Sequence, residues 1–100
     1  MELEVSPDAA GYIGERGGRL YLWQERVGHA WATDHMSFDD PRLGVAFNPV
    51  WVDGGVALML AEDLEPPRSV LVRLRRIPRG LQVEWDGKTW GWRGDAAGGG

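Results

Sequence analysis

Turn signals divide the second half of this chain into segments too short for long helices. Four of them combine Gly, Pro and Asp: Asp53-Gly54-Gly55, Glu65-Pro66-Pro67, Pro78-Arg79-Gly80 and Asp86-Gly87. Gly and Pro interrupt regular structure, and Asp-Gly is typical of a β-hairpin. The segments between these turns are rich in β-branched and aromatic residues, which favour strands. We therefore predict strands over residues 45–52, 69–77, 81–85 and 88–92, with Pro49 restricting the first of them to an edge or a bulge.

The first part of the chain predicts a strand, a helix and a second strand. Apolar and acidic residues alternate over 2–5, the pattern of a half-buried strand. Ser6-Pro7-Asp8 then combines a capping side chain, a proline suited to the first helical turn and an acid at the positive end of the helix. Gly17-Gly18 supplies the stop. Residues 19–27 have large apolar groups on both faces, so we expect a central strand covered on both sides.

Two segments leave alternatives open. Residues 28–44 show no clear periodicity, so either a strand lies within 30–38 or the whole segment is a functional loop. Residues 56–61 form an apolar run that fits a strand, and 56–64 fits a short helix equally well.

These elements predict one small α+β domain. A chain of 100 residues is long enough for a single core. We expect a mostly antiparallel or mixed β-sheet with one packed helix over residues 1–93, followed by a flexible Gly-rich tail over 94–100.

Composition removes several classes of function. The chain has no cysteine, which excludes disulfides and thiolate chemistry. The net charge of −4 disfavours nucleic acid as a general partner. The apolar run at 56–61 is too short to cross a membrane, and the first residues do not resemble a signal peptide. We therefore expect a cytoplasmic protein without a membrane partner.

The segment 6–13 reads Ser-Pro-Asp-Ala-Ala-Gly-Tyr-Ile and follows a short strand. It resembles the capped helix, of the form T/S-x-x-A-A-x-x-I, of the A-type iron–sulfur carriers, the HesB/IscA-like proteins. The glycine turn, the strand over 20–27 and the corner at Gly28-His29-Ala30-Trp31 follow in that family's order. Gly55 to Leu60 and the stretch 77–83 are similar to later family features. The resemblance is strongest over residues 3–28 and implies a HesB-like fold.

The three family cysteines that bind the cluster or iron are all missing. His29 falls at or next to the first cysteine position, and the C-terminal pair falls near 86–90, where Asp86 is the only ligand offered. The resemblance therefore implies a domain that has lost cysteine-based iron–sulfur binding. We expect a binding or interaction module with a protein partner or a second copy of itself, no resident cofactor and no enzymatic activity. The three serines lie in no setting that suits a nucleophile.

A metal site is the first alternative. It would bind iron or zinc through His29, His35 and Asp34 with help from loop carboxylates. On a strand the two histidines would lie about 20 Å apart, and on a helix they would face nearly opposite sides. Only a folded-back loop brings them together. A solvated loop, with an ordinary turn at Asp39-Asp40-Pro41, is the simpler explanation of the segment.

An anion or partner site is the second alternative. No acid interrupts residues 66–83, and Arg73 and Arg75 share one strand face. Together with Trp90 and Trp92 they could form a basic, aromatic surface for an anionic ligand or nucleic acid within the Arg68–Arg79 region. The competing interpretation pairs Arg73 and Arg75 with acids of the next strand and places the tryptophans in the core.

Overall fold

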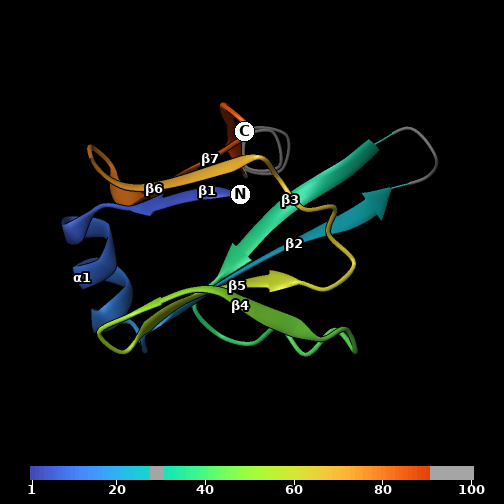
Figure 1. The fold of residues 1–100 in the computed structure, drawn as a ribbon, viewed down its shortest axis with the longest axis horizontal. Coiled ribbons are helices and arrows are strands. Elements are labelled where there is room, and N and C mark those ends of the chain that lie inside the picture. Colours follow the sequence, from blue (N-terminus) through green and yellow to red (C-terminus); the bar gives the residue numbers. More distant parts are fainter. Residues whose placement is uncertain (28–30, 91–100) are drawn as a thin grey trace.

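The computed structural model describes residues 1–27 and 31–90, with only the backbone described at Val27 and Trp31. This part of the chain contains one helix and eight strands (Figure 1). In chain order they are β1 (Glu2–Val5), α1 (Pro7–Glu15), β2 (Arg19–Val27), β3 (Trp31–Ser37), β4 (Phe47–Asp53), β5 (Val56–Ala61), β6 (Ser69–Arg76), β7 (Arg79–Trp85) and β8 (Lys88–Trp90). The predicted α+β class is confirmed. None of the helices in the described residues is long and apolar enough to span a membrane.

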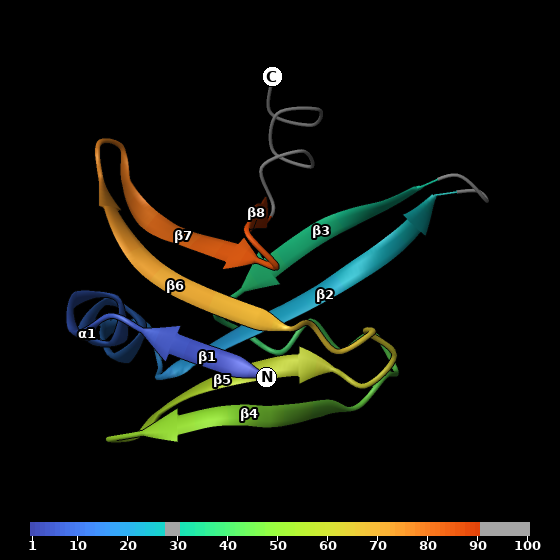
Figure 2. The same ribbon diagram turned by 45° about the horizontal axis from the view of Figure 1, so that its top comes forward.

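The strands form two sheets, where the sequence analysis expected one. The first sheet has the order β1-β6-β7-β8 and the second the order β3-β2-β5-β4. Each sheet is mixed, because β1 pairs parallel with β6 and β2 pairs parallel with β5, while the other neighbours are antiparallel. Figures 1 and 2 show the two sheets as layers, with α1 at one end between them. The helix contacts β6 of one sheet and β2 and β5 of the other.

The core lies between the inner faces of the two sheets. Alternation along the strands decides which side chains reach it, since successive residues of a strand point to opposite faces. Ile13 of α1 joins this cluster, so the helix closes one end of the core. Its largest fully buried side chains are Ile13, Leu20, Leu22, Leu58, Val70, Val72 and Val83.

Both ends of α1 follow from the predicted local signals. The Ala9 N–H donates to the Ser6 Oγ at 3.3 Å, and Pro7 occupies the first turn. After the helix the chain passes through Gly17 and Gly18, whose φ angles are 110° and 87°. A Cβ on Gly18 would lie 2.7 Å from the Gly55 carbonyl oxygen, so this close approach of α1 to the β4–β5 turn requires glycine.

The N-cap gives a prediction for stability and pH. The Ser6 Oγ donates to Asp8 Oδ1 at 2.6 Å, and this bond, foremost, holds the pKa of Asp8 below its usual range. A lowered pKa stabilises the folded state at neutral pH, and this contribution is lost as the pH falls through the lowered pKa. We expect Ser6→Ala to lower the free energy of unfolding by about 1 kcal/mol at neutral pH. At acidic pH the difference in unfolding free energy between the wild type and Ser6→Ala should be smaller.

An NMR titration of the Asp8 carboxyl in both proteins tests this explanation. The pKa of Asp8 should rise in Ser6→Ala, and an unchanged pKa would contradict the assigned cause. Ser69→Ala, which changes a serine that does not cap α1, is the control.

The two segments for which the sequence left alternatives both contain a strand in the structure. Residues 31–37 form β3, which pairs with β2 from Val27↔Trp31 to Tyr21↔Ser37. Residues 56–61 form β5, so the helix alternative for 56–64 is wrong. It pairs with β2 on one side and with β4 on the other, and the hairpin turn at Gly54-Gly55, with φ angles of 57° and 83°, connects it to β4. Pro49 lies on the edge strand β4 next to a bulge, as predicted.

Candidate functional site

The structure separates two of the three predicted metal ligands. Asp34 and His35 are successive residues of β3, so their side chains point to opposite faces of the sheet. Asp34 is buried and accepts a hydrogen bond from Gln24 Nε2 at 2.8 Å. His35 stacks on the Trp23 ring at a centroid distance of 5.4 Å, and its Nε2 lies 3.7 Å from Glu25 Oε1.

His29 lies outside the described residues, so its place relative to His35 and Asp34 stays a prediction. Within residues 1–27 and 31–90, no three side chains of the metal-binding types gather into one group. The proposed role of His35 in a metal site therefore has no support from its neighbours, because the ring is occupied by an aromatic stack and a single carboxylate.

Trp90 is part of the core and not of an exposed surface. Its side chain is 4% exposed, and the ring packs on Trp85 with centroids 4.6 Å apart. The indole Nε1–H donates to the His35 carbonyl oxygen at 3.0 Å, which connects β8 of one sheet to the edge strand β3 of the other. Figure 2 shows β8 beside β3. The expectation that Trp90 offers a stacking surface is therefore wrong, because the ring lies between the sheets. Trp92 is outside the described residues.

Arg73 and Arg75 share one face of β6 but have different surroundings. An Nη atom of Arg73 lies 2.6 Å from Glu84 Oε2 on β7, the cross-strand pairing that the competing interpretation predicted. Arg75 instead donates from Nε to the Pro78 carbonyl oxygen at 3.2 Å and keeps no carboxylate within ion-pair distance among the described residues. Of the two, Arg75 is the one whose charge is available to a ligand.

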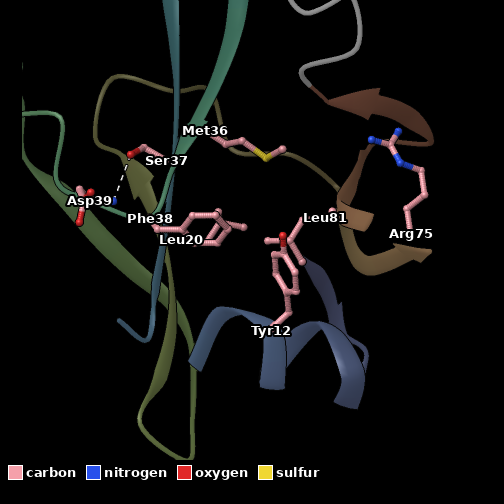
Figure 3. A pocket seen from close by; sticks show the side chains of 9 residues that line it. Tyr12, Leu20, Met36, Ser37, Phe38, Asp39, Arg75 and Leu81 are labelled. Atoms are coloured by element: carbon pink, nitrogen blue, oxygen red, sulfur yellow. Dashed lines mark hydrogen bonds between the residues drawn. The ribbon is translucent and has the colours of Figure 1, made fainter. Parts of the chain in front are cut away.

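Arg75 lines a cavity that we call the β3–β7 pocket. It has a volume of about 430 Å³. It lies where the end of β3 approaches β7 near Leu81. Its apolar side chains come from four elements and one loop: Tyr12 of α1, Leu20 of β2, Met36 of β3, Leu81 of β7, and Phe38 in the loop after β3. Figure 3 shows Tyr12 rising from the helix, with Phe38, Leu20 and Met36 on one side and Arg75 on the opposite side.

The polar groups at the pocket are few. The Asp39 N–H donates to the Ser37 Oγ at 3.0 Å, which fixes the turn after β3. Gly80 pairs with Arg75 across the hairpin, and a Cβ there would lie 3.9 Å from Arg75 Nη2. Because cross-strand partners share a face, the guanidinium of Arg75 lies beside Gly80. Among the described lining residues, Asp39 is the only acid.

Two further arginines lie against the Tyr12 wall. The guanidinium carbon of Arg16 is 3.5 Å from the centroid of the Tyr12 ring, and that of Arg79 is 5.1 Å from it. Glu15 Oε2 lies 3.6 Å from Arg16 and 3.8 Å from Arg79, so one exposed carboxylate serves both cations. Such exposed ion pairs are weak, and solvent competes for them.

Sequence reasoning missed most of this pocket. It singled out Arg75, but Tyr12, Met36 and Phe38 carried no signal because they come from separate parts of the chain. The one available clue was the pair Tyr12 and Arg16, four residues apart on a helix and therefore on one face.

Comparison with known proteins gave no match: no family model, no curated protein and no solved structure is significantly similar to this chain. The function therefore has to be argued from the geometry of the site.

Proposed function

We propose that this chain is a non-enzymatic binding domain whose ligand occupies the β3–β7 pocket. The observation that carries the proposal is the pocket itself, because its volume of about 430 Å³ lies within the range of small-molecule sites. Its lining combines apolar side chains with the polar groups of Ser37, Asp39 and Arg75, and binding sites join apolar contact with a few polar groups in the same way. Among the described residues no nucleophile and base are paired there: Ser37 accepts from a backbone N–H, and His35 lies on the Trp23 face of β3.

We further propose that the domain is a HesB-like member that has lost cysteine-based iron–sulfur binding. The order strand, capped helix, glycine turn and long strand supports this, since it is the order on which the resemblance rests. The sequence supplies no thiolate for a cluster. A role as a binding module is consistent with both observations.

Blocking the pocket tests the proposal. Met36 is half-buried and points into the pocket from β3, so Met36→Trp should fill much of it with an indole ring (Figure 3). We expect a panel of uncharged, cationic and anionic aromatic fragments to include binders that shift the backbone NMR signals of Tyr12, Phe38 and Leu81. These shifts should disappear in Met36→Trp.

Met59→Trp is the matched control. Met59 is also half-buried, but it lies on β5 and lines a different hollow beside Pro49. Fragment shifts that persist unchanged in a folded Met36→Trp protein, or that never include the pocket residues in the wild type, would refute the proposal.

A further inference from the structure

The charges around the β3–β7 pocket select one kind of ligand. Arg75 lines the pocket, and Arg16 and Arg79 lie against its Tyr12 wall. Against these three cations stand Asp39 in the lining and Glu15 outside it. The three cations outnumber the two acids, so the charge at the pocket favours an anionic ligand. The whole chain has a net charge of −4, so this positive charge is confined to the pocket region.

The apolar wall defines the rest of the ligand. Leu20 and Leu81 are buried, and Met36, Phe38 and Tyr12 are half-buried around the same space. The aliphatic or aromatic part of a ligand would be transferred out of water at this position and would contact apolar side chains on several sides. A polyanion such as nucleic acid would gain nothing from this wall and would be repelled by the net charge.

We infer that the β3–β7 pocket binds a small amphipathic anion, whose apolar body contacts Met36, Phe38 and Leu81 and whose carboxylate, sulfonate or phosphate group pairs with Arg75. This inference rests on the proposed function and names its ligand class. Arg75 suits the role because its guanidinium presents several donors in a fixed plane, which matches the oxygens of such groups. The guanidinium lies beside Gly80, the cross-strand partner of Arg75 on β7.

Glu15 and Asp39 weaken anion binding in this arrangement. The Glu15 carboxylate lies between Arg16 and Arg79 and partly neutralises them. Asp39 repels an anion directly from the lining. Removing either acid should therefore increase the affinity for an anion. A substitution that merely destabilises the fold would instead lower the affinity.

The experiment compares two fluorescent probes of similar shape. Anilinonaphthalene sulfonate has a naphthalene body with one sulfonate, and N-phenylnaphthylamine is its uncharged counterpart. The full chain is titrated with each probe at low and high salt. We expect one molecule of the sulfonate to bind per chain, with an affinity that falls as salt rises, since part of the attraction is exposed and screened.

Four variants separate charge from shape. Arg75→Gln should weaken sulfonate binding about tenfold, equivalent to roughly 1.4 kcal/mol, and leave the uncharged probe unchanged. Arg76→Gln is the control, because it removes the same charge from the next residue, which does not line the pocket. Glu15→Gln and Asp39→Asn should each strengthen sulfonate binding by about two- to threefold.

The outcomes distinguish this inference from the function on which it depends. If both probes bind, both are lost in Met36→Trp and neither responds to Arg75→Gln, the pocket is a binding site but the charge selection is refuted. If neither probe responds to Met36→Trp, both proposals are refuted. A response of the sulfonate to Arg75→Gln and Arg76→Gln alike would show only non-specific attraction and would also overturn the inference.

Discussion

Replacing Trp90 by alanine is expected to lower the free energy of unfolding by about 3–5 kcal/mol. The indole is buried between the sheets, and its loss removes the contact with Trp85 and the hydrogen bond to the His35 carbonyl oxygen. Small domains have a total stability of roughly 5–15 kcal/mol. The change is therefore large enough to unfold a substantial fraction of the protein, and urea unfolding followed by circular dichroism measures it.

Trp90→Phe separates packing from hydrogen bonding at this position. Phenylalanine keeps most of the ring volume but has no N–H, so the variant should lose only about 1–2 kcal/mol. Trp51→Ala is the comparison on the edge strand β4, where the side chain is half-buried and the loss should be smaller. A cost below about 1 kcal/mol for Trp90→Ala would contradict the role of Trp90 in joining the sheets.

The second large effect is expected at Asp86, in the turn between β7 and β8. Its Oδ1 accepts from the backbone N–H groups of Arg68 at 2.6 Å and Ser69 at 3.0 Å, which holds the start of β6 against the hairpin. Its φ angle is 52°, a left-handed conformation that Asp and Asn tolerate better than Ala. Asp86→Ala should therefore cost about 2 kcal/mol.

Thermal and urea unfolding of matched variants tests the prediction for Asp86. Asp86→Asn keeps an acceptor and the left-handed preference, so about half of the loss should be recovered. Asp53→Ala changes the exposed acid before the other tight turn and should cost less than about 0.5 kcal/mol. Equal losses in Asp86→Ala and Asp53→Ala would show that the bonds to Arg68 and Ser69 contribute little.

Trp90 shows why the sequence alone could not define the neighbours of Arg75. From the sequence, Trp90 could lie on either face of the last hairpin, because alternation defines two faces but does not say which one is covered. The second sheet covers one face, and Trp90 is on it. Arg75 lines a pocket together with Tyr12, Phe38 and Leu81, and Trp90 is not among its described lining residues.

The sequence by itself determined the local elements of this protein. Ser6 and Pro7 start the helix, Gly17 and Gly18 end it, and the turns at Gly54-Gly55 and Asp86-Gly87 define two hairpins. These outcomes depend on steric limits and hydrogen bonds within a few residues, so neighbouring residue types suffice to predict them.

Only the tertiary structure decided the division into two sheets and the position of the pocket. The parallel pairings of β1 with β6 and of β2 with β5 join segments that are far apart in the chain. A two-residue alternation does not encode which distant strand becomes the neighbour, because every strand offers the same backbone donors and acceptors. The partner is decided by how the apolar faces of all eight strands and α1 pack together, and the β3–β7 pocket is the space that this packing leaves beside Arg75.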